Sequence, residues 1–472
     1  MAIKNIKLYD LQYFLFALGL FFFPFNNFEG INVLGEFRNE AGAFFFLAGI
    51  FSLVFNRKLY IPYKNIFFQL MMIFVVWAFI ATLINWSTVS ENYFKFTSGI
   101  NRFIKQYISL LISFVGFFLF FLNIIYKMSA SEILYKIRKI FLISLLVVSI
   151  YGFFETLIAV FGVYTLLPVL DAFSYFPFTN LYIHDGRIAS VTFEPPFLAI
   201  YLISICSWMF SYILTSKNIA RYIPTLLILV LTYFSGSRTA LIIISLQFVV
   251  FSSFLIRTSH NRKSIIQFFK FAIIGLIILL IFNSEKIVKS VDEKLESLNF
   301  TENLKSNISN QSRFGMQYAA LVVFSQHPIA GVGYGQQTYH SRFHYPKWAT
   351  KNNYEFELFY QNSHEPSFPP AYNLYTRLLA EVGIVGIIII VFLFYTLLKS
   401  CLKLLKKEKN GDRKTLIIII FVGFIGFFIN WMQFDAFRVY SFWLALAILI
   451  NLIDTKNKHL DEKNSAHNTT LQ

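Results

Sequence analysis

Long apolar runs recur along the chain, and they constrain its fold more than any other feature. A membrane-spanning helix needs roughly 17–25 mostly apolar residues, and we find about twelve such runs. Charged residues make up only 14% of the chain, against about 25% in soluble proteins. The sequence therefore predicts an all-α polytopic membrane protein. The predicted transmembrane helices centre near Leu18, Leu47, Phe74, Phe117, Val148, Ser204, Ile228, Leu246, Ile277, Ile388, Ile420 and Ala447.

Basic residues predict the orientation. Lys4 and Lys7 precede the first run, and NRKLYIPYK, KMSASEILYKIRK, SKNIAR, RTSHNRK and KSCLKLLKKEKNGDRK follow later ones. The alternate connections contain few lysines and arginines, so the basic segments and both termini are expected on the cytoplasmic side. No small-x-small cleavage pattern follows Leu11–Phe23, which predicts a retained first helix rather than a signal peptide. The net charge of +16 fits this topology and anionic lipid headgroups, and no nucleic-acid partner is expected.

One connection is far longer than the others. We expect residues 1–283 to carry about nine transmembrane helices, 284–372 to form a large extracytoplasmic loop, and 373–472 to carry about three more helices and a cytoplasmic tail. Connections in compact proteins usually have about 4–6 residues, so a loop of this length is typically functional. Within it, Phe314–Phe324 has the spacing of an amphipathic helix on the membrane surface. GVGYG, with Gly331 and Gly333, predicts a tight turn.

Arginines on the outer side are the candidate binding residues. Arg238 lies in YFSGSRTALIII, a short polar break between two apolar runs, while Arg187 and Arg313 lie in other outer connections. A guanidinium group is always charged and matches phosphate oxygens in a bidentate way. The three could converge on one anion. The alternative is that they are interfacial anchors like Arg38, Arg102 and Arg438.

Four segments resemble known motifs in the expected order between Arg187 and Gly383. SGSRTAL, RFGMQYAALVVFSQHPIAGVGYG and YNLYTRLLAEVG resemble three signatures of the O-antigen ligase and polymerase superfamily. GRIASVTFEPPFLA resembles a stretch common in the polymerase branch. The first 180 residues are similar to the family only as generic membrane helices.

The resemblance implies a C-type glycosyltransferase in the bacterial inner membrane, with its active site on the outer face. It implies undecaprenyl-diphosphate-linked oligosaccharides as donor and acceptor, and a chain-length-regulating co-polymerase as a further partner. Arg187, Arg238 and Arg313 would bind the donor diphosphate. We expect no cofactor. We also expect no metal, because Glu355 and Glu357 form only an isolated pair and the two cysteines, Cys206 and Cys401, have no ligand spacing.

The chain departs from the family pattern at Tyr372, where the ligase branch has a histidine before Asn373. This favours a polymerase over a ligase. Tyrosine has an unperturbed pKa of about 10 and is a poor base, so the candidate acceptor bases are His364, Glu365 and Glu194.

Two further residues of this motif are charged, namely Arg377 and Glu381. A carboxylate within a spanning helix is a functional candidate, and the alternative is an ion pair between these two residues, four apart on one helix face. A transporter for lipid-linked sugars is the rival function, although no internal repeat is found.

The predicted topology can be tested with single cysteines. A cysteine at Ser306, in the long loop, should react with an impermeant thiol reagent in intact cells. A cysteine at Ser400 should be protected, because the Lys- and Arg-rich segment around it is expected inside. Equal labelling of both positions would contradict the predicted orientation.

Overall fold

The computed structural model describes residues 2–28, 30, 37–56, 58–174, 182–184, 186–216, 218–256, 307–408 and 411–469. The predicted helix near Ile277 and the first part of the long loop lie outside these residues. The described part is mainly helical. Its elements are α1 (Ala2–Phe21), α2 (Ala41–Leu53), α3 (Ile66–Ile84), α4 (Trp86–Glu91), β1 (Tyr93–Phe94), β2 (Thr97–Ser98), α5 (Gly99–Leu111), η2 (Ile112–Phe117), α6 (Phe118–Ile125), α7 (Ala130–Ala159), η3 (Tyr164–Leu166), α8 (Leu167–Ser174), α9 (Pro195–Thr215), η4 (Ile219–Tyr222), α10 (Ile223–Phe234), α11 (Arg238–Ile256), α14 (Ile308–Gln326), α15 (Gln337–Ser341), α16 (Lys347–Thr350), η5 (Glu355–Tyr360), α17 (Leu374–Lys407), α18 (Asp412–Asn430) and α19 (Tyr440–Thr469).

Six helical stretches of the described part are long and apolar enough to cross a membrane. They are Ile66–Ile84, Gly99–Ile125, Ala130–Ala159, Pro195–Thr215, Arg238–Ile256 and Leu374–Lys407. Four shorter apolar helices and α18 contain the other predicted centres that the structure describes. The polytopic helical fold is thus confirmed. Not every predicted spanning helix is long enough to cross the bilayer. Helix α2, for example, has 13 residues and is only roughly 20 Å long, less than the thickness of the hydrocarbon core.

Local sequence signals explain where several helices begin. Ser129 and Glu132 form a capping box at the start of α7, which satisfies two backbone N–H groups that a helix leaves unpaired. Asn65 caps α3 by accepting a hydrogen bond from the N–H of Phe67 at 3.0 Å. Two prolines open α9, where the missing N–H and fixed φ of proline suit the first helical turn.

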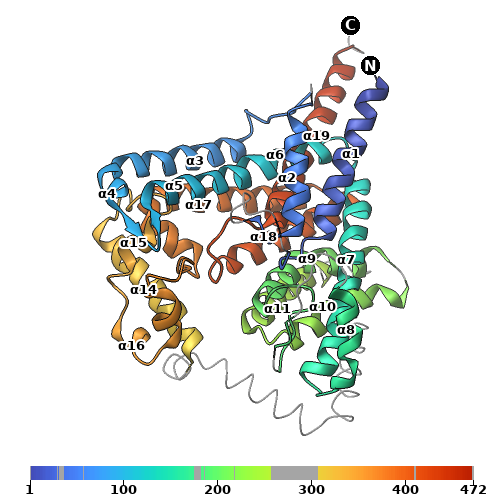
Figure 1. Ribbon diagram of the computed structural model, residues 1–472. Coiled ribbons are helices and arrows are strands. Elements are labelled where there is room, and N and C mark those ends of the chain that lie inside the picture. Colours follow the sequence, from blue (N-terminus) through green and yellow to red (C-terminus); the bar gives the residue numbers. More distant parts are fainter. Residues whose placement is uncertain are drawn as a thin grey trace.

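Packing between helices places the long loop beside the membrane bundle. Helix α17 packs against α3 and α14, and α9 packs against α10, α11 and α18. Figure 1 shows α3, α5 and α17 running in similar directions on one side of the molecule, with α14 to α16 next to them. The ends of α1 and α19 that lie nearest the chain termini are at the same end of the molecule (Figure 1).

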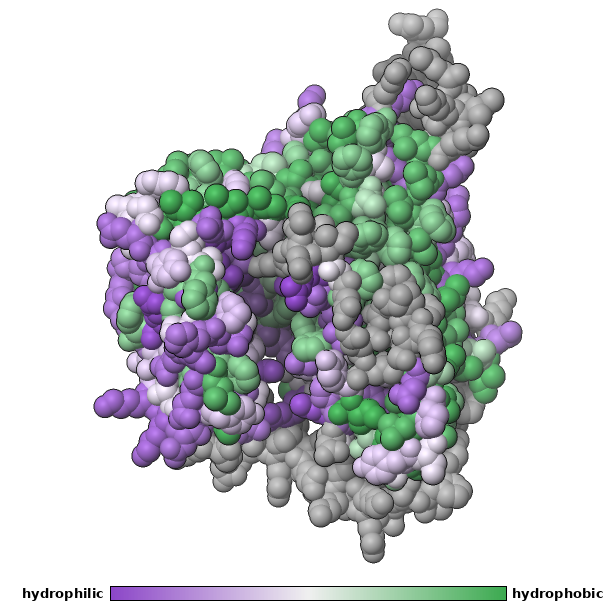
Figure 2. All heavy atoms as spheres, in the orientation of Figure 1, coloured by the Kyte–Doolittle hydropathy of each residue, from purple (hydrophilic) through white to green (hydrophobic). Residues whose placement is uncertain are grey.

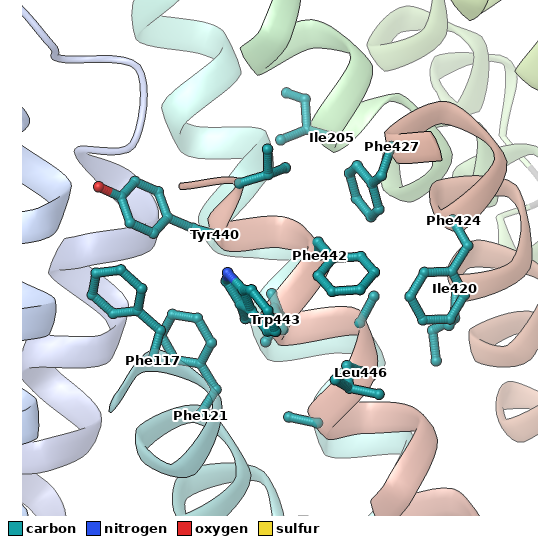
Figure 3. Packing of buried hydrophobic residues seen from close by; sticks show 14 of the residues in the cluster. Phe117, Phe121, Ile205, Ile420, Phe424, Phe427, Tyr440, Phe442, Trp443 and Leu446 are labelled. Atoms are coloured by element: carbon teal, nitrogen blue, oxygen red, sulfur yellow. The ribbon is translucent and has the colours of Figure 1, made fainter. Parts of the chain in front are cut away.

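Aromatic side chains fill the centre of the bundle. Phe442 and Trp443 of α19 lie between Phe117, from η2, and Phe424, from α18 (Figure 3). Trp443 is fully buried, and its indole N–H donates to the carbonyl of Phe437 at 2.9 Å. Between helices in a bilayer such close packing supplies much of the association energy, because lipid tails are as apolar as the side chains.

Hydropathy divides the surface into two regions. Figure 2 shows hydrophobic residues over the region of α1, α2 and α3, and many hydrophilic residues over α14 to α16. Within α14, Gly315 and Ala319 are buried, whereas Phe314, Tyr318 and Leu321 are exposed. The structure therefore has a helix where the sequence predicts an amphipathic one, and part of its exposed surface is apolar.

Candidate functional site

Arg238 begins helix α11 directly after a tight turn from α10. Gly236 in this turn has a φ of 67°, a left-handed conformation that glycine adopts at little cost. The hydroxyl of Ser235 accepts the N–H of Ser237 at 3.2 Å, and the hydroxyl of Ser237 accepts the N–H of Ala240 at 3.3 Å. These bonds fix the turn that precedes Arg238 and therefore the position from which its side chain extends.

The first turn of α14 meets Arg238. Asn307 caps α14 by accepting the N–H of Asn310 at 3.1 Å, and Arg238 Nη2 donates to Asn310 Oδ1 at 3.3 Å. Arg313 follows one helical turn later, and its charge lies close enough to Arg238 for the two cations to repel. Two guanidinium groups from distant parts of the chain therefore share one region.

Two buried nitrogens in this region have no hydrogen-bond acceptor in the described part of the chain. They are Asn310 Nδ2 and Arg313 Nε. A buried donor without an acceptor costs roughly 1–3 kcal/mol. Residues three apart on a helix lie on neighbouring parts of one face, so an anion bound there could accept from both.

Arg187 lies against the same turn. A Cβ atom built on Gly236 would be 3.3 Å from Arg187 Cβ, and the N–H of Ile188 donates to the carbonyl of Phe234 at 3.0 Å. The side chain of Arg187 is exposed. The three arginines that the sequence analysis groups are therefore arranged around one turn of the chain.

The ring of Tyr372 lies against Arg313. The guanidinium carbon of Arg313 is 5.2 Å from the centre of the Tyr372 ring, a cation–π distance. The Tyr372 hydroxyl is 2.6 Å from that of Tyr360. Burial raises the pKa of Tyr372 above its ordinary value, and burial also raises the pKa of Tyr360. Both phenols are therefore neutral near pH 7.

Asn373 connects two helices. Its Oδ1 accepts the N–H groups of Tyr375 at 2.9 Å and Thr376 at 3.2 Å, which makes it the N-cap of α17. Its Nδ2 donates to Gln317 Oε1 at 3.4 Å. Asn373 thus holds the start of α17 against α14.

Arg377 and Glu381 form a buried ion pair, with Arg377 Nε 3.1 Å from Glu381 Oε1. Arg377 also donates to the carbonyl of Asp435 at 2.8 Å and to Gln106 Oε1 at 2.7 Å. Glu381 is only 2% exposed. The geometry is that of the i, i+4 ion pair that the sequence analysis gives as the alternative to a functional carboxylate.

Gly331 and Gly333 form the tight turn that GVGYG predicts, with φ values of 64° and 101°. The N–H of Val332 donates to the carbonyl of Ala380, and that of Gly333 to the carbonyl of Glu381, both at 2.9 Å. A Cβ atom on Gly331 would lie 2.5 Å from the Ala380 oxygen. The glycines therefore allow backbone to dock directly on backbone.

Helix α17 is broken at the point where this loop docks. Gly383 has φ 63° and ψ −167°, and the N–H of Ile384 donates to the carbonyl of Pro328 at 2.9 Å. A Cβ atom on Gly383 would lie 2.1 Å from the Ile329 oxygen. No other residue type fits this position without movement of the backbone.

The candidate bases His364 and Glu365 lie on a surface loop. The imidazole of His364 is exposed and forms no hydrogen bond or ion pair within the described residues. Glu365 Oε1 accepts the Ser367 hydroxyl at 2.7 Å and the Ser367 N–H at 3.3 Å. These bonds lower the pKa of Glu365, which makes its carboxylate a weaker base.

Glu194 lies at the start of α9, where its backbone carbonyl accepts the Thr192 hydroxyl at 3.0 Å. In the described part of the chain its carboxylate makes no ion pair with Arg187, Arg238 or Arg313. The structure thus groups the arginines with Tyr372 and does not bring the three candidate bases into contact with them.

Asn310 is the residue of this site that the sequence analysis missed. Its position three residues before Arg313 places it on the neighbouring turn of the same helix face, and this spacing was the available signal. Figure 2 shows that the hydrophilic surface is hollowed between the part formed by α14 to α16 and the part near α10 and α11. The Arg238–Asn310 bond joins α11 to α14.

Comparison with known families agrees with the motifs. Residues 223–391 match the family model described as O-antigen ligase, so this segment is similar to the O-antigen ligase/polymerase superfamily. The matched range contains Arg238, Arg313 and the whole of the segment from Tyr372 to Gly383, but not Arg187. No curated protein matches the chain at a significant level.

The break in α17 predicts a large effect of Gly383→Ala. A φ of 63° is unfavourable for alanine, and the alanine Cβ would collide with the Ile329 carbonyl. We therefore expect the free energy of unfolding to fall by more than about 2 kcal/mol. Thermal unfolding of the detergent-solubilised protein measures it. Gly423→Ala is the matched control, because its nearest neighbour would be 3.4 Å away. Equal melting temperatures for both variants would contradict this account of the break.

Proposed function

We propose that the protein is a polysaccharide polymerase of the bacterial inner membrane. It transfers the growing glycan from its undecaprenyl-diphosphate carrier to a hydroxyl of the incoming lipid-linked repeat, on the outer face of the membrane. The match of residues 223–391 to the O-antigen ligase family supports this proposal, because members of that superfamily act on lipid-linked glycans.

The observation that carries the proposal is the group of donors around Arg238. Arg238 and Arg313 are close together, and Asn310 Nδ2 and Arg313 Nε are buried with no acceptor in the part of the chain that the structure describes. Helices α11 and α14 also direct their N-terminal ends to the Arg238–Asn310 contact, and such ends carry partial positive charge. A diphosphate would satisfy these donors and compensate the charges.

The reaction needs a stabilised leaving group and an acceptor that loses a proton. The acceptor hydroxyl oxygen forms a bond to C1 of the donor sugar, and the bond between C1 and the diphosphate oxygen breaks. The diphosphate leaves with the electron pair, and the acceptor proton passes to a base. Fixed donors placed where charge develops contribute typically about 10²–10³ in rate each. Arg187, Arg238 and Arg313 take this role in the proposal.

Tyr372 favours a polymerase over a ligase, because a phenol with a raised pKa cannot replace the histidine expected as the base of the ligase branch. A ligase is the second candidate, since O-antigen ligase is the description of the matching family. A flippase for the same lipid-linked sugars is the third. In the polymerase proposal a separate co-polymerase sets the chain length, and membrane lipids surround the helices.

Deletion of the gene separates the three functions through the intermediate that accumulates. Loss of a polymerase leaves single repeats on their carrier at the outer face. Loss of a ligase leaves long polymer on the carrier, and loss of a flippase leaves single repeats inside. We expect the first result.

Arg238→Ala should fail to restore polymer in this deletion strain, and Arg238→Lys should restore it only partly, because lysine keeps the charge but loses the bidentate fork. Protein abundance in the membrane is the control. Near wild-type polymer with Arg238→Ala would exclude a role for Arg238 in binding the diphosphate.

The acceptor base is tested with substitutions of His364 and of Tyr372. The two Tyr372 variants separate the role of the aromatic ring from that of the hydroxyl. We expect His364→Ala to lose most polymerisation, since an imidazole is the side chain that most often acts as a general base, and candidate bases often reach their target only in the substrate complex. Tyr372→Phe should lose little, because phenylalanine keeps the ring beneath Arg313, whereas Tyr372→Ala should lose more. Polymer length and yield on gels measure all three. If His364→Ala is normal while Glu365→Gln or Glu194→Gln is inactive, a carboxylate is the base.

A further inference from the structure

Helix α7 carries a carboxylate that the reaction does not use. Glu155 is 1% exposed and lies within a helix long and apolar enough to span the membrane. In the described part of the chain it forms no ion pair. Its Oε1 accepts the N–H of Ala189 at 3.0 Å, and its Oε2 accepts the N–H of Ser190 at 2.6 Å. Ionisable residues in spanning helices are costly and usually functional.

The backbone that Glu155 binds has an unusual conformation. Ser190 has a φ of 53°, which for a residue other than glycine costs of order 1–3 kcal/mol. The Ser190 hydroxyl also donates to the carbonyl of Val148 at 2.7 Å. The carboxylate of Glu155 therefore binds two successive backbone N–H groups and stabilises the strained turn.

One face of α7 is shaped for this turn. Val148, Gly152 and Glu155 follow each other at intervals of four and three residues, which places them on one side of the helix. A Cβ atom on Gly152 would be 3.5 Å from Ile188 Cδ1 and 3.7 Å from Ser190 Cβ. The segment thus packs closely along α7.

Arg187 lies between the fixed residues of this segment. On one side, the N–H of Gly186 donates to the carbonyl of Ala159 at 3.1 Å, and on the other, the N–H of Ile188 donates to the carbonyl of Phe234 at 3.0 Å. The Arg187 side chain is exposed beside Gly236. Its backbone anchors therefore decide where the guanidinium can reach.

We propose that Glu155 is a positioning residue of the anion site, whose carboxylate holds the backbone segment 186–190 so that Arg187 reaches the donor diphosphate. This inference rests on the proposed role of Arg187. A glutamine at position 155 would offer one acceptor and one donor to two N–H groups, so one N–H would lose its partner and the segment would shift. Aspartate would keep both oxygens on a shorter side chain.

The test measures binding of undecaprenyl diphosphate to the full-length protein purified in detergent, from the ligand dependence of its melting temperature. We expect Glu155→Gln and Arg187→Ala each to weaken binding by about tenfold or more. The double variant should bind as Arg187→Ala does, because Glu155 acts through that arginine. Glu155→Asp should bind with an intermediate affinity. Thr156→Val is the matched control, since the Thr156 hydroxyl bonds only the carbonyl of Gly152 in its own helix, at 2.6 Å.

Each outcome decides between the two proposals. If Arg187→Ala binds like the wild type, Arg187 is not part of the anion site and both the assignment and this inference are wrong. If Arg187→Ala is weak while Glu155→Gln binds normally, the anion site stands and the positioning role is wrong. A further loss in the double variant would mean that Glu155 acts elsewhere. Should Glu155→Gln fail to accumulate, Glu155→Asp answers the question, and wild-type affinity in that variant would overturn the inference.

Discussion

The break in α17 at Gly383 is the constraint on which the site depends. Backbone groups freed by a broken helix need new partners where water is excluded. The loop that follows α14 supplies them through the bonds of Pro328, Val332 and Gly333 to α17. This docking fixes the end of α14 against the first turns of α17, and so it brings Arg313 above the ring of Tyr372. Motifs that are separate in the sequence thus become one structural unit.

Three acids of the described helices have structural partners. Glu155 binds two backbone N–H groups, Glu381 pairs with Arg377, and Glu40 pairs with Arg438 at 2.8 Å. Arg238 Nη2 donates to the amide oxygen of Asn310, and the Arg313 guanidinium lies against the ring of Tyr372. Cations in a region of low dielectric create a strong positive electrostatic potential. That potential suits an anionic headgroup at the membrane surface.

The features that could be predicted from the sequence are those set by local periodicity. The centres of the apolar runs fall on apolar helices wherever the structure describes them, GVGYG forms its turn, and Arg377 meets Glu381 at the predicted helical spacing. Helix lengths were harder to predict from the sequence, because apolar residues continue past a helix end, as Phe22 to Phe25 do after α1. The spacing of Asn310 and Arg313 indicated a shared helix face, but not the contact of Asn310 with Arg238. The role of Glu155 was not predictable, since it depends on contact with a segment distant in the chain and periodicity carries no information about such contacts.

The three arginines differ in how firmly the structure holds them, and this difference predicts how much each one stabilises the leaving group. Arg238 starts a helix behind a capped turn, and Arg313 sits one turn into α14 against a partly buried aromatic ring, so both guanidinium groups have little freedom to lose on binding. Arg187 is exposed and is held only through its backbone. An arginine fixed before binding stabilises developing charge more effectively than one that must be ordered, because the ordering entropy opposes it. In the proposed reaction Arg238 and Arg313 would therefore carry most of the leaving-group stabilisation, and Arg187 would close the site from the side held by α7.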